Sequence, residues 1–177
     1  MGKITSLAKT IRSIPDFPKP GILFRDITTL LKDKRAFKKT VGLLAKEFKH
    51  KKIDYVVGVE ARGFILGGAI AEKIGVGFVP VRKKGKLPWK TKSVTYELEY
   101  GTDTLEVHED ALEPGCRVLI VDDLLATGGT VHAVAQLVEA QKAKIVGIAF
   151  VIELVDLKGR EKLKKYPILS LIEFEGE

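Results

Sequence analysis

Two adjacent carboxylates followed by a threonine- and glycine-rich loop form the strongest chemical signal in the sequence. They lie in the run VLIVDDLLATGGT, from Val118 to Thr130. Asp122 and Asp123 carry oxygens that can accept hydrogen bonds from the vicinal hydroxyls of a ribose. Gly128 and Gly129 have no Cβ, so backbone N–H groups there can approach a phosphate closely. The run therefore predicts a site for a phosphorylated ribose.

The predicted ribose-phosphate ligands all come from this run. A helix is expected to begin near its end, and the N–H groups of a helix N-terminus bind anions. The ligands are expected to be Asp122, Asp123, Ala126, Thr127, Gly128, Gly129 and Thr130. Two other phosphate-binding patterns, G-x-x-x-x-G-K-[ST] and a G-x-G-x-x-G after a strand, are absent from the sequence. The alternative for the same residues is a tight structural turn.

Basic residues follow two other apolar runs. Arg62 comes shortly after DYVVGV (Asp54–Val59), and the turn RKKGK (Arg82–Lys86) directly follows GFVPV (Gly77–Val81). If these runs are parallel strands, the cations lie at their carboxyl ends, where open α/β sheets bind ligands. The pattern predicts a second anion site beside the first, since arginine binds phosphate oxygens bidentately. A solvated basic turn is the alternative for Arg82–Lys86.

Continuous apolar runs that alternate with helical patterns indicate the fold class. Runs that do not alternate in polarity are typical of parallel strands buried on both faces. The strands are expected at Asp54–Val59, Gly77–Val81, Arg117–Val121 and Ile145–Ile152. The helices are expected at 61–75, ending at Gly75, and from about Thr130 to Gln141, with an earlier one that Asp33 caps and that carries Phe37, Val41, Leu44, Ala45 and Phe48 on one face. We therefore expect one α/β domain with a mostly parallel sheet flanked by helices.

Two segments depart from this alternation of strands and helices. SVTYELEYGTDTLEVH (Ser93–His108) alternates in polarity and turns at Gly101, which predicts a β-hairpin that leaves the core. Such excursions can fold over a site. IPDFPKPGILFRD (Ile14–Asp26) holds three prolines and a glycine, which predicts an ordered loop or cap rather than a helix.

The composition limits the class of protein. The chain has 177 residues, a length that favours one domain. Its one cysteine, Cys116, excludes a disulfide framework and favours a reducing compartment, so a cytoplasmic location is expected. No apolar run approaches the roughly 20 residues of a membrane span, and no membrane partner is expected. The net charge of +7 allows a nucleic-acid partner, but the lysines are spread over probable surfaces and none is expected.

The run VLIVDDLLATGGT resembles the phosphoribosyl pyrophosphate (PRPP) motif of the type I phosphoribosyltransferases. Other segments resemble the members of that family that act on adenine, in order along nearly the whole chain. They are IPDFPKPGILFRDIT (14–28), GVEARGF (58–64), RKKGKLP (82–88), YELEYG (96–101) and LKGREKL (157–163). The resemblance implies transfer of ribose 5-phosphate from PRPP to N9 of adenine, giving AMP and pyrophosphate in purine salvage. Trp89 and Lys90 depart from the pattern, since many relatives have a small or acidic residue there.

The resemblance also implies roles for residues outside the ribose-phosphate run. Glu99 would help to manage the proton lost as N9 attacks, and Tyr100 would belong to a flexible hairpin lid at 93–108. The pyrophosphate ligands would be Glu60, Ala61, Arg62, Gly63, Arg82, Lys83 and Lys86. The adenine ligands would be Leu23, Phe24 and Arg25, within an N-terminal cap at 1–32. A Mg²⁺ ion would be carried by PRPP and pyrophosphate, with no direct protein ligand.

Partners and alternatives follow from the same resemblance. It implies a homodimer with the type I phosphoribosyltransferase fold over residues 1–177. One alternative is another purine phosphoribosyltransferase, specific for hypoxanthine and guanine or for xanthine. The second is a non-enzymatic regulator that senses PRPP and binds nucleic acid. The regulator needs a DNA-binding extension, and the region before Asp54 offers a cap and one helix rather than a helix-turn-helix pair.

Overall fold

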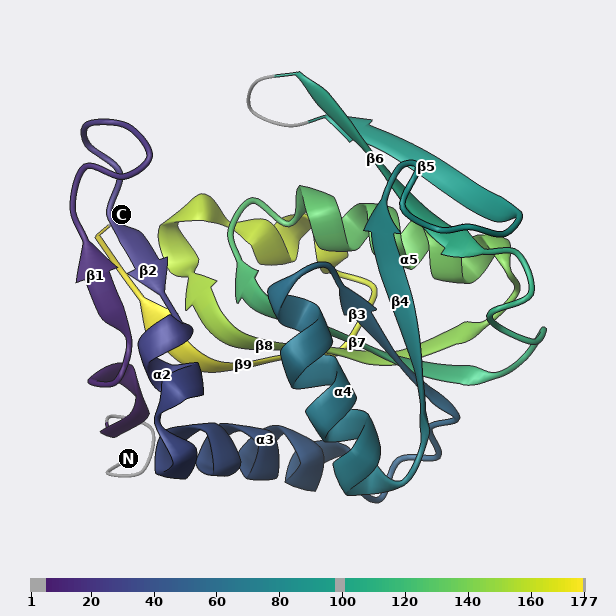
Figure 1. Cartoon of the computed structure of the whole chain (residues 1–177), viewed down its shortest axis with the longest axis horizontal. Helices are drawn as coiled ribbons and strands as arrows, with labels where there is room; N and C mark the ends of the chain where they lie inside the picture. The colour runs from purple at the N-terminus through teal and green to yellow at the C-terminus, as the bar shows by residue number, and fades with distance from the viewer. Residues whose placement is uncertain (1–5, 98–100, 177) are drawn as a thin grey trace.

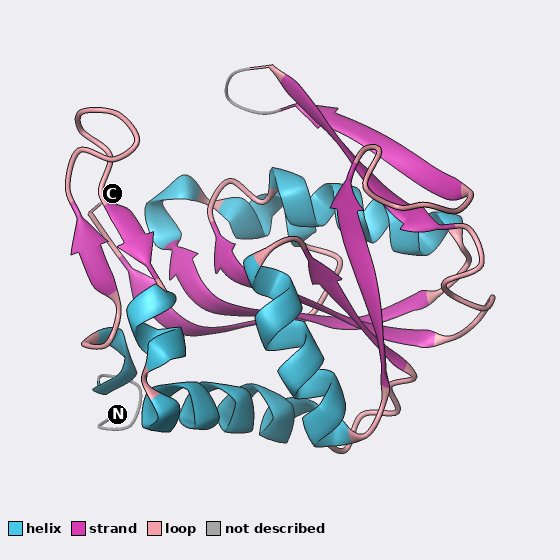
Figure 2. Cartoon of the chain, viewed as in Figure 1, coloured by secondary structure: helices cyan, strands magenta, loops and turns pink. Residues whose placement is uncertain are grey.

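The protein is built around a seven-stranded sheet with helices on both faces (Figures 1 and 2). The structure, a computed structural model, describes residues 6–97 and 101–176. The strand order is β5-β6-β4-β3-β7-β8-β9. The strands of this sheet are β3 (Tyr55–Val59), β4 (Gly77–Lys83), β5 (Thr91–Glu97), β6 (Thr102–His108), β7 (Arg117–Leu125), β8 (Lys144–Leu154) and β9 (Ile168–Phe174). The helices are α2 (Thr28–Lys32), α3 (Lys34–Phe48), α4 (Arg62–Ile74) and α5 (Gly129–Ala140), with 3₁₀ turns η1 (Val155–Leu157) and η2 (Gly159–Leu163).

The five central and distal strands are parallel, as the sequence predicts. β4, β3, β7, β8 and β9 run in one direction, and each face of the sheet has its own apolar cluster. Helices α3 and α4 cover one face, and α5 with η2 covers the other (Figure 1). Leu119 on the first side and Phe150 on the second are fully buried. The alternating strand and helix pattern therefore yields the predicted α/β fold class.

The helix boundaries confirm two predicted end signals. Asp33 accepts hydrogen bonds from the backbone N–H groups of Arg35 and Ala36, at 2.8 and 2.9 Å, and so caps the N-terminus of α3. Gly75 ends α4 in the left-handed conformation, with a φ of 78°, which a residue without Cβ adopts at low cost. Asp33 thus fixes where α3 begins, and Gly75 fixes where α4 ends before β4.

The strand that carries the acid pair is longer than its apolar pattern indicates. β7 continues past Val121 to Leu125, because pairing with β8 persists through Leu125 and Glu153. Its pairing with β3 stops earlier, at Gly58 and Val121. The prediction that Asp122 and Asp123 follow the strand is therefore wrong. They lie within it, beside an edge that β3 no longer covers.

The hairpin is confirmed, but it joins the sheet rather than leaving it. β5 and β6 pair from Thr91 with His108 to Glu97 with Thr102. β6 also pairs with the end of β4, where Arg82 faces Glu106. Leu105 and Val107 are consequently buried in the core, which an isolated excursion would not achieve. The last strand, β9, lies at the opposite edge and was not among the predicted elements.

The N-terminal proline-rich segment forms a two-stranded antiparallel ribbon. β1 (Arg12–Ile14) pairs with β2 (Phe24–Asp26), and the loop between them holds the prolines. Arg12 binds the buried carboxylate of Asp26 through two guanidinium nitrogens, at 3.1 and 2.5 Å. The backbone N–H of Thr28 donates to the same side chain at 2.8 Å. This ion pair connects the ribbon to the first turn of α2.

Arg12→Gln is expected to lower the stability of the protein near neutral pH and to weaken the dependence of that stability on pH below about 4. The hydrogen bond from Arg12 is the largest cause that lowers the pKa of Asp26 from 3.8 to about 2. A lowered folded-state pKa contributes stability above about pH 3.9, which is lost as the pH falls through 2. Since Arg12 is largely exposed, the loss at neutral pH should be about 1 kcal/mol.

Urea unfolding between pH 2.5 and 7 measures this effect. Arg35→Gln, which removes the same charge from an exposed position of α3, is the control. Identical pH profiles for Arg12→Gln and the wild type would contradict the assignment.

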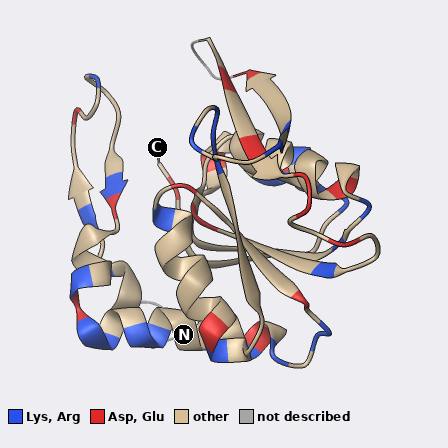
Figure 3. Cartoon of the chain, turned by 45° about the vertical axis from the view of Figure 1, so that its right-hand side comes forward, with Lys and Arg blue, Asp and Glu red and all other residues tan. Residues whose placement is uncertain are grey.

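Charged residues are distributed over the whole surface. Lys and Arg occur on helices, turns and strand ends, with Asp and Glu between them (Figure 3). No helix among the described residues is long and apolar enough to cross a membrane. The basic turn after β4 stands beside acidic positions of the β5–β6 hairpin, and this neighbourhood belongs to the site described next (Figure 3).

Candidate active site

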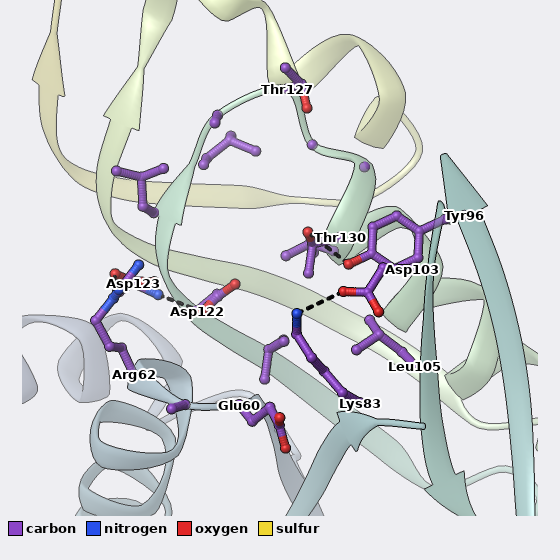
Figure 4. A pocket seen from close by; sticks show the side chains of 18 residues that line it. Glu60, Arg62, Lys83, Tyr96, Asp103, Leu105, Asp122, Asp123, Thr127 and Thr130 are labelled. Atoms are coloured by element: carbon purple, nitrogen blue, oxygen red, sulfur yellow. Dashed lines mark hydrogen bonds and ion pairs between the residues drawn. The ribbon is translucent and has the colours of Figure 1, made fainter. Parts of the chain in front are cut away.

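A cavity of about 510 Å³ opens at the carboxyl ends of β3 and β7 (Figure 4). Four parts of the chain line it: the turn after β3, the end of β4, the β5–β6 hairpin, and the run from the acid pair into α5. The lining residues are Val59, Glu60, Ala61, Arg62, Lys83, Tyr96, Asp103, Leu105 and 122–131. The parallel sheet explains this convergence, since its strands end at the same edge.

The acid pair projects into the cavity from the part of β7 beyond β3. Asp123 is 5% exposed and accepts a hydrogen bond from Nε of Arg62. Asp122 accepts a 2.9 Å hydrogen bond from the backbone N–H of Asp123. Burial, together with the neighbouring Asp123 carboxylate, raises the pKa of Asp122 well above its usual range. One acid is therefore paired with a cation, while the other is costly to ionise in this environment.

Asp122→Asn is expected to raise the melting temperature while lowering activity. The raised pKa means that ionising Asp122 costs folding free energy, and this cost grows as the pH rises above about 3.9. The amide keeps an acceptor oxygen for the N–H of Asp123 and removes the repulsion between two carboxylates. We expect a rise in Tm of about 2–4 °C at pH 7, equivalent to about 1 kcal/mol in a chain of this size.

Thermal unfolding at pH 4 and pH 7 tests this pH dependence. The gain should shrink at pH 4, close to the ordinary pKa of an aspartate, because the raised pKa of Asp122 then costs little folding free energy. An equal gain at both pH values would show that charge is not the cause.

The loop after β7 prepares an anion site at the start of α5. Gly128 adopts a φ of 77°, a left-handed conformation that glycine tolerates, and the helix begins at Gly129. Among the described residues no side chain caps this end, so its first N–H groups face the cavity without an intrahelical partner. The hydroxyl of Thr130 lies 3.4 Å from that of Tyr96 on the hairpin. Helix dipole and free donors together favour a phosphate here.

Among the described residues, the two cations that line the cavity are paired with carboxylates of the same site (Figure 4). Arg62 binds Asp123, and Nζ of Lys83 lies 2.9 Å from Asp103 on the hairpin. Glu60 pairs with two other cations of the basic turn, Arg82 at 2.8 Å and Lys86 at 3.3 Å. Burial raises the pKa of Glu60, but the hydrogen bonds from Arg82 and Lys86 outweigh it and lower the pKa overall. Likewise, the hydrogen bond from Lys83 lowers the pKa of Asp103.

Most residues predicted from the sequence come together in this cavity, and some lie just outside it. All seven predicted ribose-phosphate residues line it, as do Glu60, Ala61, Arg62 and Lys83. Arg82 and Lys86 reach the cavity only through Glu60. Gly63 is buried below the turn, where an added Cβ would lie 3.0 Å from Asp122 Oδ1, so this position requires a small residue for packing.

The predicted adenine residues do not line the cavity. Phe24 packs edge-on against Phe17 in the N-terminal ribbon, with ring centroids 5.2 Å apart. The guanidinium of Arg25 stacks on the ring of Phe174 at 4.0 Å, which attaches the ribbon to the end of β9. Glu99 and Tyr100 lie outside the described residues. Their predicted roles and those of Leu23, Phe24 and Arg25 stay predictions.

Three lining residues of the hairpin were not predicted. They are Tyr96, Asp103 and Leu105, from β5 and β6. The alternating pattern of the hairpin could have indicated two of them, because it places Asp103 and Leu105 on the same face of β6. The pairing of β6 with β4 then directs that face toward Lys83, and only the tertiary structure supplies this pairing.

Comparison with known proteins agrees with this geometry. The family model described as "Phosphoribosyl transferase domain" matches residues 26–175, which include the whole sheet and the cavity. The chain therefore belongs to the phosphoribosyltransferase family, and its fold is the type I phosphoribosyltransferase fold.

Relatives place the chain within one branch of that family. An adenine phosphoribosyltransferase of Trichormus variabilis is 59% identical over 170 residues, covering 95% of this chain and 99% of the relative. The crystal structure of adenine phosphoribosyltransferase from Thermoanaerobacter pseudethanolicus superimposes with a TM-score of 0.94 at 54% identity, covering 97% of this chain and 100% of that one. A Saccharomyces cerevisiae adenine phosphoribosyltransferase, solved with an imino-altritol bisphosphate and adenine, gives a TM-score of 0.90 at 43% identity, with coverage of 95% and 97%. The chain belongs with the adenine phosphoribosyltransferases.

Proposed function

We propose that this chain transfers the 5-phosphoribosyl group of PRPP to N9 of adenine and releases pyrophosphate. The observation that carries the proposal is the cavity itself. It combines an acid pair, an uncapped helix N-terminus with a glycine loop, and a group of cations at the same sheet edge. The relatives named adenine phosphoribosyltransferase, which match over nearly the full chain, support adenine as the acceptor.

The reaction exchanges one bond at C1 of the ribose for another. N9 of adenine supplies the electron pair for the new C1–N bond, the C1–O bond breaks, and its electrons leave with pyrophosphate. The imidazole ring of adenine loses its proton to a base. Positive charge develops on the sugar and negative charge on the leaving group, so fixed charges around both are the main means of stabilising the transition state.

In this reaction the acid pair would hold the ribose. Asp122 and Asp123 accept hydrogen bonds from its hydroxyls, while the loop 126–130 and the N-terminus of α5 bind the 5′-phosphate. Asp123 accepts a hydrogen bond from Arg62, and sugar binding would exchange this partner. Arg62 would then be free to donate to pyrophosphate.

The other cations would make the same exchange on the pyrophosphate side. Lys83 leaves Asp103, and Arg82 and Lys86 leave Glu60, each for a phosphate oxygen. Asp122 and Asp123 present hard carboxylate oxygens beside the proposed pyrophosphate position. That donor set fits Mg²⁺ bound through water. When bound, the ion would supply positive charge that offsets the charge of pyrophosphate.

The base and its proton would be managed by the two segments that flank the open side of the site. The N-terminal ribbon and the β5–β6 hairpin project on the same side of the sheet (Figures 1 and 3). Leu23, Phe24 and Arg25 of the cap (1–32) would contact adenine. Glu99 would receive the proton, and Tyr100 would help the hairpin (93–108) to exclude water as a lid. The assembly is proposed to be a cytoplasmic homodimer, and its mass in gel filtration tests the oligomeric state.

Pyrophosphate release from PRPP and Mg²⁺ tests the proposal directly. Adenine, hypoxanthine, guanine and xanthine are supplied in turn, and we expect turnover with adenine alone. Addition of a chelator in excess of Mg²⁺ should abolish it. Absence of turnover with adenine would overturn the proposal, and preferential turnover with another base would support the alternative purine enzyme.

A further inference from the structure

Two glycines from distant parts of the chain face each other beneath the phosphate loop. A Cβ on Gly128 would lie 2.5 Å from the carbonyl oxygen of Gly159, and a Cβ on Gly159 would lie 2.2 Å from that of Ala126. Real Cβ atoms do not approach backbone oxygens this closely. The backbone of the loop 126–129 therefore rests directly on the backbone at Gly159, with no side chain between them.

The residue next to Gly159, Arg160, is anchored by an ion pair with the buried carboxylate of Glu153. Nε and a terminal nitrogen of Arg160 each bind one oxygen of Glu153, both at 2.6 Å. The same guanidinium contacts the hydroxyl of Ser170 on β9 at 3.3 Å. Burial raises the pKa of Glu153, yet the hydrogen bonds from Arg160 outweigh it, so the net shift is downward and the carboxylate stays charged. A bidentate pair of this kind fixes orientation as well as distance.

The Arg160–Glu153 pair lies beside the end of β7, the strand that precedes the phosphate loop. Glu153 on β8 pairs in register with Leu125, the last residue of β7. An added Cβ on Gly159 would also lie 2.8 Å from Cδ1 of Leu125. Further along η2, Leu163 is fully buried in the apolar cluster that contains Val131 of α5. The segment 157–163 therefore packs against both elements that flank the phosphate loop. Gly159 contacts the end of β7, which precedes the loop, and Leu163 packs near α5, which follows it.

We propose that Gly159 and the Arg160–Glu153 pair are positioning residues that set the backbone conformation of the phosphate loop 126–129. They do not line the cavity, so they act through the loop rather than on the substrate. Without this support the backbone of the loop would shift toward the segment 157–163 or away from it. Its N–H groups would then no longer point at the phosphate. The inference rests on the proposed function, since it assumes that the loop binds the 5′-phosphate.

Binding of ribose 5-phosphate and of Mg²⁺-pyrophosphate to Gly159→Ala, measured by calorimetry, tests the inference. The added methyl must displace Ala126, so we expect the Kd for ribose 5-phosphate to rise at least about tenfold, because misplacing a positioned group by about 1 Å has effects of this order or larger. The Kd for pyrophosphate, which is bound on the other side of the site, should change less than about twofold. A residue with only a structural role would affect both ligands in parallel.

Gly42→Ala is the matched control. Gly42 lies in α3, and an added Cβ there has no neighbour within 4 Å. It should leave both dissociation constants unchanged. Equal binding of ribose 5-phosphate by wild type and Gly159→Ala would overturn the positioning role alone, whereas a wild type that does not bind ribose 5-phosphate would overturn the proposed function as well.

Arg160→Lys keeps the inference testable if Gly159→Ala fails to fold. Lysine retains the charge beside Glu153 but not the bidentate geometry. For Arg160→Lys we expect a smaller rise in the Kd for ribose 5-phosphate than for Gly159→Ala, with the Kd for pyrophosphate again little changed. Arg160→Met should raise the Kd for ribose 5-phosphate more than Arg160→Lys does. An unchanged affinity for ribose 5-phosphate in both variants would contradict the proposal.

Discussion

Asp123→Asn is expected to lower kcat/KM for PRPP by about 100-fold. A hydrogen bond to a charged group contributes about 1.5–3 kcal/mol, so losing the charge that accepts the hydrogen bonds of the ribose hydroxyls is enough for this effect. Asp123 is nearly fully buried, and water would not replace the missing charge. The neutral amide would also present N–H groups where the ribose hydroxyl needs an acceptor. The measurement is steady-state kinetics with PRPP varied at saturating adenine.

Asp110→Asn removes the same charge from an exposed position outside the cavity and serves as the control. It should behave as the wild type. If Asp123→Asn kept the kinetics of the wild type, Asp123 would be a structural acceptor for Arg62 and the ribose role would be wrong.

Glu99→Leu is expected to lower kcat by about 10²–10⁴-fold, the usual contribution of a positioned proton acceptor. The prediction rests on the resemblance of LEYG to the adenine-specific members of the family, and Glu99 lies outside the described residues. Loss of the carboxylate removes the acceptor for the adenine proton but leaves the phosphate and ribose contacts in place. The effect should therefore fall on kcat, while the Kd for PRPP stays near that of the wild type. Single-turnover kinetics and PRPP titration separate the two quantities.

Glu97→Leu is a close control, since Glu97 is the same residue type two positions earlier and is exposed at the end of β5. Its substitution should leave kcat near that of the wild type. A loss of PRPP affinity without a loss of kcat in Glu99→Leu would instead make Glu99 a binding residue.

The charged side chains of the site form ion pairs with one another. The cations Arg62, Lys83, Arg82 and Lys86 each have a carboxylate partner in the site. Unpaired cations so close together would repel one another, and partly buried charges need partners. In the proposed reaction, substrate binding would replace these ion pairs with others, so the net gain in binding free energy would depend on geometry more than on charge alone.

The sequence by itself determined the class of fold and the chemistry of the ribose-phosphate site. Continuous apolar runs indicated buried parallel strands, and the acids, glycines and threonines of Val118–Thr130 are contiguous, so their proximity needs no tertiary information. Helix ends at Asp33 and Gly75 were equally local, because capping depends on residues within one turn.

Only the tertiary structure decided which distant residues contact these local segments. The pairing of β6 with β4 brings Asp103 to Lys83, the early end of β3 uncovers Asp122 and Asp123, and η2 returns Gly159 to the loop that begins 33 residues earlier at Ala126. Strand pairing and backbone contact between distant segments depend on the packing of the whole sheet, and residue type or spacing does not encode them locally. A short segment of the sequence therefore predicts the ligand, whereas the structural support for that segment comes from the fold.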